Sequence, residues 1–235
     1  MIKQIAEESP RVTARMAGVF YLLVFVTGGL ALSTGGRLVV SGNPAATATN
    51  ILAHEALFRL GWTVNLIATA CYVVVTALFY VLFKPAGRSL SLTAAFFSLV
   101  GCAIGGFSAV FQLAPLTILK GAHGSSAFTP EQLQALAYTF LRLGGGNIGL
   151  VFFGFYCLLI GCLILRSTFL PRILGAGMII AGLGWVTFLW APLANYLSPY
   201  NLAPGILGEG LLTLWLLVAG VNVQRWREQA GVEHV

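Results

Sequence analysis

The sequence predicts an all-α bundle of about six transmembrane helices, and three observations support this prediction. Of the 235 residues, 58% are hydrophobic and only 9% are charged, whereas a soluble domain has about 25% charged residues. The mean hydropathy is +0.89. Several apolar runs reach the roughly 20 residues that a helix needs to cross a hydrocarbon core of about 30 Å. A soluble globular protein is therefore excluded.

Six apolar runs are expected to form one integral-membrane domain over residues 1–235. A backbone in lipid must satisfy its own hydrogen bonds, and the runs lack the alternation of a barrel strand, so each run is predicted to be a helix. The expected spans are about Met16 to Leu32, Leu60 to Phe83, Ser91 to Leu119, Leu143 to Leu165, Ile173 to Ala191 and Gly205 to Val223.

The first span is long for the apolar region of a signal peptide, so we expect it to stay in the protein. With a cytoplasmic N-terminus, nine basic residues fall on inside segments and four on outside segments. The inside set is Lys3, Arg11, Arg15, Lys84, Arg88, Arg166, Arg172, Arg225 and Arg227, and the outside set is Arg37, Arg59, Lys120 and Arg142. The positive-inside rule then predicts a multi-pass protein of the inner (plasma) membrane with both termini in the cytoplasm. It also explains the net charge of +6, so no nucleic-acid partner is predicted.

The second span carries a polar stripe. At 100° per residue, its polar side chains fall within an arc of about 140°. They are Glu55, Arg59, Trp62, Asn65, Thr69, Tyr72, Thr76 and Tyr80. Because polar side chains are costly in lipid, this face is expected to point into the bundle. It would either line an internal pocket or form hydrogen bonds between helices, and the sequence leaves both alternatives open.

The third and fifth spans carry stripes of small residues, which let neighbouring helices approach closely. The third-span stripe is Ala94, Ser98, Gly101, Gly105, Ser108, Gln112 and Pro115, and the fifth-span stripe is Gly177, Ala181 and Gly184. We interpret both as helix contacts.

An internal repeat is predicted from short sequence segments that resemble each other. Asn43-Pro44 and Thr129-Pro130 each place a capping side chain before a proline at the first helical position. The sequence LFRLG at 57–61 resembles FLRLG at 140–144, and RMAG at 15–18 resembles RILG at 172–175. We infer three helical hairpins of the same orientation, whereas many secondary transporters have inverted repeats.

Four cysteines lie inside the expected spans and are predicted to be buried small hydrophobic residues. They are Cys71, Cys102, Cys157 and Cys162. Because Cys157 and Cys162 project about 140° apart around a helix, and the three histidines are dispersed (His54, His123 and His234), we predict no metal site and no cofactor.

All seven acidic residues are glutamates. Four are expected in exposed tails (Glu7, Glu8, Glu228 and Glu233), and Glu131 follows Pro130 in a first helical turn, where its charge suits the helix dipole. Two remain. Glu55 precedes Arg59 by one turn, in the order that favours an ion pair. Glu209, between Gly208 and Gly210, is the acid most deeply embedded in the membrane.

Two acids and two arginines are therefore expected together near the outer end of the bundle: Glu55, Arg59, Arg142 and Glu209. Gln112, Tyr138, His54 and Asn147 are candidates to join them. The network would either lock the hairpins together or form a site open to the outer leaflet. In that site an arginine would hold an anionic head group, and a desolvated glutamate would exchange a proton.

Three short stretches of the sequence are distinctive enough to compare with known families. They are ATATNI at 46–51 with EALFR at 55–59, LRSTFLPRILG at 165–175, and Gly208-Glu209 with LWLL at 214–217. They resemble the bacterial membrane family catalogued as domain of unknown function 4386, and the middle stretch is the most specific. The resemblance covers nearly the whole chain. It implies an inner-membrane protein with about six spans, and it implies no activity.

Three functions remain as alternatives. The favoured one is binding of a lipid-like or amphipathic molecule in an outer-leaflet polar pocket, with Arg59, Trp62, Asn65, Tyr72, Gln112 and Arg142 as ligand-binding residues. The second is an intramembrane enzyme for a lipidic or isoprenoid substrate, similar in layout to membrane terpene cyclases. Its acid and base would be Glu55 and Glu209, and its cavity would be lined by aromatic residues such as Trp62, Tyr72, Trp185 and Trp190. The third is a small transporter. Membrane lipids are predicted partners, and assembly into a homo-oligomer is left open.

Overall fold

The computed structural model describes residues 9–121, 128–145 and 147–232. Within these ranges the regular structure is entirely helical, which confirms the predicted fold class. Six helical stretches are long and apolar enough to cross a membrane: Pro10–Ala31, Glu55–Ala86, Arg88–Gly121, Pro130–Arg166, Arg172–Leu189 and Tyr200–Val218. Several residues named above lie outside the described ranges (Lys3, Glu7, Glu8, His123, Glu233 and His234).

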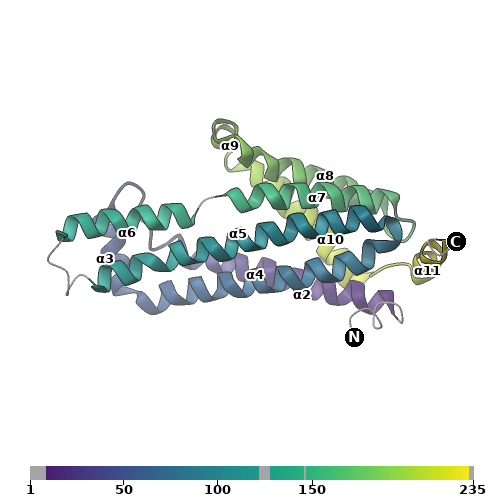
Figure 1. Cartoon of the computed structure of the whole chain (residues 1–235), viewed down its shortest axis with the longest axis horizontal. Helices are drawn as coiled ribbons and strands as arrows, with labels where there is room; N and C mark the ends of the chain where they lie inside the picture. The colour runs from purple at the N-terminus through teal and green to yellow at the C-terminus, as the bar shows by residue number, and fades with distance from the viewer. Residues whose placement is uncertain (1–8, 122–127, 146, 233–235) are drawn as a thin grey trace. The chain divides into compact units, whose positions relative to one another are not determined.

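Figure 1 shows the helices in chain order. The α-helices are α2 (Pro10–Gly35), α3 (Pro44–Ala53), α4 (Glu55–Phe83), α5 (Arg88–Gly121), α6 (Pro130–Gly144), α7 (Ile148–Arg166), α8 (Arg172–Val186), α9 (Ala191–Leu197), α10 (Ala203–Val218) and α11 (Val223–Val232). Short 3-10 turns are η1 (Lys84–Ala86), η2 (Thr187–Leu189) and η3 (Tyr200–Leu202).

Both predicted capping signals start helices. The Asn43 side chain accepts a hydrogen bond from the Ala46 amide at the start of α3. Thr129 and Gln132 form a reciprocal capping box at the start of α6. The signals are therefore confirmed as helix starts, whereas the threefold repeat stays a prediction.

The sixth span ends at Val218 and not at the predicted Val223. Gly220 adopts a φ of 66°, a left-handed conformation that terminates α10, and its amide donates to the Trp215 carbonyl. Asn222 then caps the next helix, since its side chain accepts from the Arg225 amide. Residues 219–222 are thus a turn into α11.

The chain divides into two compact units. Unit 1 comprises Met1–Leu23, Ala70–Cys102 and Asn147–Val235, and unit 2 comprises Val24–Thr69 and Ala103–Gly146. The helices α2, α4 and α5 each contribute one segment to each unit. That the chain behaves as one domain stays a prediction.

Glycine seams hold α7, α8 and α10 of unit 1 together, and Figure 1 shows these helices side by side. A Cβ atom added at Gly161 of α7 would lie 2.7 Å from Ile179 Cγ1 and 2.8 Å from the Gly175 carbonyl oxygen of α8. A Cβ atom added at Gly208 of α10 would lie 2.9 Å from Ala181 Cβ of α8. The backbones therefore touch where no side chain intervenes, and the fifth-span stripe is confirmed as a helix contact.

The third-span stripe is also a contact surface, and its residues meet partners in both units. In unit 1, Ser98 Oγ lies 2.6 Å from Thr76 Oγ1, and a Cβ atom added at Gly101 would lie 3.0 Å from Phe153 Cζ. In unit 2, a Cβ atom at Gly105 would lie 3.8 Å from Thr69 Oγ1. These contacts confirm close helix packing along α5.

Unit 2 has a small apolar core beneath α3 and α6, which lie side by side. The core consists of Leu38, Ala48, Ile51, Phe58, Leu116, Leu119 and Ala137.

Three of the four cysteines are buried as predicted, but Cys162 is exposed. Cys157 and Cys162 project in directions about 140° apart on α7, so Cys157 faces the interior of unit 1 and Cys162 faces outward.

Candidate functional site

A cavity of about 670 Å³ opens within unit 2. Four of the six predicted ligand-binding residues line it: Trp62 and Asn65 of α4, Gln112 of α5 and Arg142 of α6. Tyr138 also lines it, one turn before Arg142. Because these five residues come from three helices, the cavity depends on the packing of α4, α5 and α6.

Hydrogen bonds hold the polar wall of this cavity in place. Trp62 Nε1 donates to the Ala109 carbonyl at 2.9 Å. Asn65 Nδ2 donates to Gln112 Oε1 at 3.3 Å, and Gln112 Nε2 donates to the Gly144 carbonyl at 2.9 Å. The bond between Gln112 and Gly144 needs a glycine, since a Cβ atom at Gly144 would lie 2.8 Å from the backbone nitrogen of Gln112.

The wall also keeps unused hydrogen-bonding capacity. An amide side chain offers two donors and one acceptor oxygen. Among the described residues, the Asn65 Oδ1 atom has no partner, and Asn65 and Gln112 each use one of their two N–H donors. The Arg142 side chain is exposed at this cavity, and no described carboxylate pairs with it. A molecule in the cavity would therefore meet one cation and two amides.

Loop residues complete the cavity. The Gly42 amide donates to the Tyr138 hydroxyl at 2.9 Å, which joins the loop after α2 to α6. Gly42 has a φ of 74°, a conformation that favours glycine. The apolar lining includes Phe58, Leu141, Ala31 and Val39. Polar and apolar sides thus meet in one cavity.

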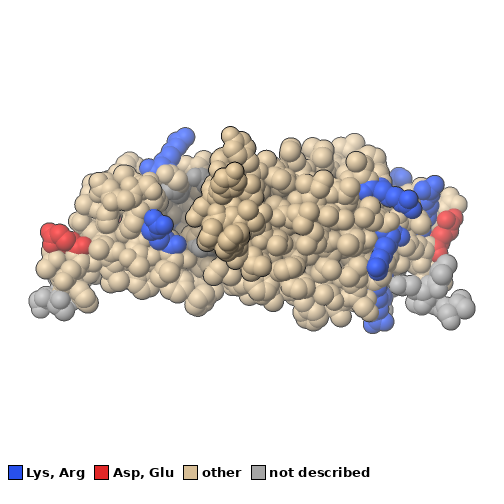
Figure 2. Space-filling view, turned by 90° about the horizontal axis from the view of Figure 1, so that it is seen from above, with Lys and Arg blue, Asp and Glu red and all other residues tan. Residues whose placement is uncertain are grey.

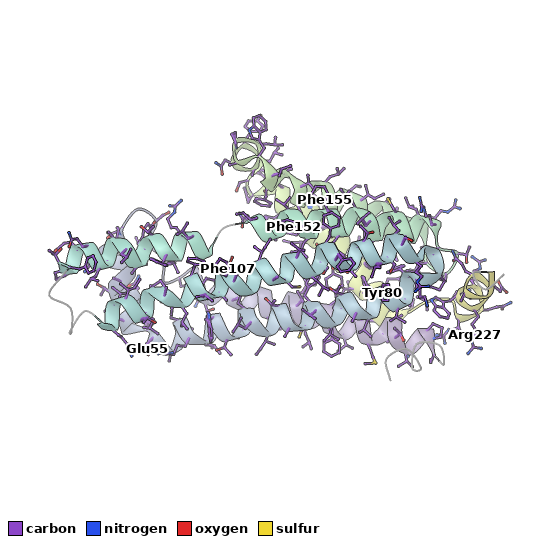
Figure 3. All side chains as sticks on the ribbon, in the orientation of Figure 1. Glu55, Tyr80, Phe107, Phe152, Phe155 and Arg227 are labelled. Carbon is purple, nitrogen blue, oxygen red and sulfur yellow. The ribbon has the colours of Figure 1, made fainter. Side chains whose placement is uncertain are left out.

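Glu55 and Arg59 do not line the cavity. They form the predicted ion pair within α4, with Arg59 Nε 2.8 Å from Glu55 Oε1. Lys120 Nζ lies 2.6 Å from Glu55 Oε2, a partner that the sequence reasoning missed. The Arg59 and Lys120 side chains are more than half exposed. Figure 3 labels Glu55 in the first turn of α4.

Glu209 lies in unit 1, and five helices of that unit meet at its carboxylate. The Tyr21 hydroxyl of α2 donates to Oε2, and the Tyr72 hydroxyl of α4 lies 3.4 Å from the same oxygen. Trp185 Nε1 of α8 donates to Oε1 at 2.5 Å, and Cys157 Sγ of α7 lies 3.6 Å from it. The Glu209 side chain is buried. We call these five residues the Glu209 hub.

Glycines bring the hub together. Gly208 contacts Gly177 and Ala181, so α10 approaches α8 closely enough for Trp185 to reach Glu209. The Trp185 indole occupies the space where a side chain at Gly205 would stand. The Tyr21 and Tyr72 rings meet edge to face at 5.5 Å between centroids.

The hub corrects the predicted network of four charges. Among the described residues, no cation pairs with Glu209, and the groups that reach its oxygens are two hydroxyls, an indole and a thiol. Glu55, Arg59 and Arg142 belong to unit 2. The reason is that four helices, α2, α4, α7 and α8, supply neutral donors to the buried carboxylate on α10, which removes the need for an arginine.

Two members of the hub were missed by sequence reasoning. Cys157 was interpreted only as a buried apolar residue, although its thiol faces the carboxylate. Tyr21 was overlooked, although it is the only polar side chain between residues 16 and 26. A lone tyrosine in an apolar span needs a hydrogen-bond partner, so that signal was available.

The chemistry of the two sites differs. In the hub each carboxylate oxygen has two donors, and Glu209 does not line the unit 2 cavity. In the unit 2 cavity a cation and two amides border open volume. Across the described residues, no three His, Cys, Asp or Glu side chains gather in a metal-binding group.

Comparisons with known proteins add a family but no activity. A family model described as domain of unknown function (DUF4386) matches residues 16–220. The chain is 28% identical over 151 residues to an uncharacterized protein of Archaeoglobus fulgidus, an alignment that covers 63% of this chain and 76% of that protein. No solved structure matches the chain significantly.

Proposed function

This chain belongs to the DUF4386 family, and we propose that it binds an amphipathic, lipid-like molecule in the unit 2 cavity. The observation that carries the proposal is the cavity of about 670 Å³ lined by Trp62, Asn65, Gln112, Tyr138 and Arg142. Ligand pockets commonly combine a mostly apolar lining with a few placed polar groups.

The lining selects a ligand with an anionic end. The Arg142 guanidinium suits a carboxylate or phosphate, and the Asn65 and Gln112 amides supply further hydrogen bonds. Phe58 and Leu141 offer apolar contact to the remainder of the molecule. Arg59 and Tyr72 play no part in this binding, because Arg59 pairs with Glu55 and Tyr72 belongs to the hub.

Two adjacent glycines of α2 give a matched test of the cavity. A Cβ atom would meet nothing within 4 Å at either Gly28 or Gly29, but only Gly28 lines the cavity. We expect Gly28→Phe to abolish binding of the fluorescent fatty acid cis-parinaric acid to the purified protein, and Gly29→Phe to bind like the original chain. Equal binding by both variants would remove the cavity from the proposal.

The anionic end is tested at Arg142. We expect Arg142→Gln to weaken cis-parinaric acid binding about tenfold, since a charged hydrogen bond is worth about 1.5 kcal/mol or more. Its methyl ester, which carries no charge, should bind both forms equally. A loss that is the same for acid and ester would contradict a role for the charge.

No contact favours the enzyme alternative over binding. The two proposed catalytic acids differ in setting: Glu55 is exposed and paired with two cations, and Glu209 is saturated by four donors. We assign to Glu209 a structural role, the locking of five helices. Loss of turnover in a folded Glu209→Gln variant, once a substrate is known, would contradict this assignment.

The topology is proposed from charge. We place the chain in the inner (plasma) membrane of a bacterium with both termini in the cytoplasm, which puts the unit 2 cavity in the outer leaflet. Figure 2 shows basic side chains gathered at the end of unit 1 that carries α11, as the positive-inside rule requires of a cytoplasmic face. Reaction of a cysteine introduced at Ser41, but not of one at Arg227, with an impermeant reagent on intact cells would support this orientation.

A further inference from the structure

A polar pocket of about 370 Å³ lies in unit 1, and no residue of the unit 2 cavity or of the Glu209 hub lines it. It is bordered by Arg11 at the start of α2, by the loop between α7 and α8, and by the turn between α10 and α11 with Arg225. Both arginines are exposed, and no described carboxylate pairs with either of them. The pocket therefore offers two cations without an internal anion.

An apolar groove of about 450 Å³ adjoins this pocket. The groove lies between α8 and α10, and Trp215 and Ala219 line both spaces. Gly177 and Gly208 form part of its floor, and the side chains along it include Ile173, Leu211 and Val218, which are all exposed. Cations thus stand at one end of an apolar channel along a membrane-spanning helix pair.

The local fold fixes the polar end. Arg225 Nη1 donates to the Thr168 carbonyl at 3.3 Å, and the Asn222 amide donates to the Phe169 carbonyl at 3.2 Å. The Thr168 amide and hydroxyl also donate to Gln229 Oε1, at 3.0 and 3.1 Å. The α7–α8 loop and the start of α11 are therefore tied together, and Arg225 is held beside the pocket.

The stretch that builds this pocket is LRSTFLPRILG at 165–175. Its residues 168–171 line the polar pocket, and its residues 173 and 174 line the groove. Neither the cavity nor the hub uses this stretch. The most specific part of the family resemblance therefore has no role in the function proposed above.

We propose that the pocket and groove together form a binding site for an anionic phospholipid. The phosphate lies between Arg11 and Arg225, which suit it because a guanidinium pairs with phosphate through two parallel hydrogen bonds. One acyl chain lies in the groove against Ile173, Leu211 and Val218. Basic pockets beside membrane-spanning helices are a known setting for anionic head groups. The proposal does not rest on the unit 2 cavity.

The test on the unaltered protein is lipid competition. The full chain in detergent is titrated with phosphatidylglycerol or with phosphatidylcholine of the same acyl chains, and bound lipid is measured by native mass spectrometry. In a third arm, inorganic phosphate is added to the complex with phosphatidylglycerol. We expect phosphatidylglycerol to bind about 25-fold more tightly than phosphatidylcholine, since each basic side chain near an anionic lipid is worth about a factor of five. Equal binding of the two lipids would overturn the proposal.

The inorganic phosphate arm separates a lipid from a free anion. A weak anion site has a dissociation constant of about 1 mM, so about 10 mM phosphate would occupy it. We expect this concentration to leave phosphatidylglycerol binding unchanged, because the acyl chain contributes through the groove. Displacement of the lipid by phosphate would mean that the pocket is a site for a free anion, and would contradict the proposal.

Variants locate the site. We expect Arg11→Gln with Arg225→Gln to remove the preference for phosphatidylglycerol. The matched control, Arg15→Gln with Arg88→Gln, changes two exposed arginines that do not line the pocket and should keep the preference. Retained preference in the first variant would mean that Arg11 and Arg225 do not hold the head group, and the same loss in both variants would assign the preference to general surface charge. Either result would overturn the proposal. If the first variant does not fold, the lipid competition on the unaltered chain still decides the proposal.

Discussion

The Glu209 hub of unit 1 and the polar cavity of unit 2 contain similar side chains in opposite states. In the hub, two tyrosines, a tryptophan and a cysteine meet one buried carboxylate. In the cavity, a tryptophan, two amides and an arginine border open volume. Residue type therefore does not decide whether a polar cluster in a membrane helix bundle is closed or open.

Glycine placement explains much of the difference. Around the hub, Gly161, Gly208 and their neighbours bring backbones into contact, and a side chain at these positions would collide with another helix. At the cavity, Gly28 has nothing within 4 Å of a built Cβ atom. Close backbone packing lets five helices share one carboxylate, whereas the open space at Gly28 leaves room for a ligand.

The largest predicted effect on stability is at Glu209, the hydrogen-bond acceptor of the hub. Glu209→Ala removes the shared acceptor of four donors, of which the Tyr21, Tyr72 and Cys157 groups are buried and the Trp185 indole is partly buried, and a buried donor left without an acceptor costs about 1–3 kcal/mol. We expect the free energy of unfolding to fall by about 3 kcal/mol or more, measured by denaturation in micelles. Gln112→Ala, in the wall of the open cavity, is the comparison and should cost about 1 kcal/mol or less.

Equal losses in these two variants would erase the distinction between a closed and an open cluster. Glu209→Gln should lie between the two, since the amide keeps one acceptor oxygen but turns N–H donors toward the other pair of donors.

An intermediate effect is expected at the glycine seam. In Gly161→Ala the new Cβ atom meets Ile179 and the Gly175 carbonyl, and overpacking of this kind costs about 1–3 kcal/mol. Gly106→Ala on α5 of unit 2 adds a methyl group with nothing within 4 Å and should be neutral or slightly stabilising. Thermal melting followed by tryptophan fluorescence checks the pair, and a neutral Gly161→Ala would refute the close contact of α7 and α8.

The smallest effect is predicted at the exposed ion pair. Glu55→Gln breaks contacts with Arg59 and Lys120, whose side chains are more than half in solvent. Exposed pairs contribute little to stability, so the melting temperature should not change. A clear loss of stability would give Glu55 the structural importance that we assign to Glu209 alone.

The fold could be predicted well from the sequence, because apolar run length and helix caps are local signals. The polar stripe of the second span could be predicted only in part. Periodicity gave its direction around α4, yet Trp62 and Asn65 face a cavity while Tyr72 and Thr76 bond to Glu209 and Ser98. Both alternatives considered for the stripe therefore occur, in different units.

The side-chain contacts between different helices could not be predicted, because the sequence alone does not show which helices pack against each other. Lys120 contacts Glu55 from α5, and the charge of Lys120 was used only to predict the membrane topology. Cys157 reaches Glu209 only because glycines let α8 and α10 approach each other. Tyr21 is the exception, since a lone tyrosine in an apolar span was a local signal.

The most direct test of the closed hub and open cavity is an experimental structure of the full chain purified from membranes in mild detergent. We predict elongated density in the unit 2 cavity that contacts Gln112 and Arg142, and a Glu209 carboxylate contacted only by the hub side chains. A cavity filled by the protein's own side chains, or ligand density against Glu209, would contradict the account.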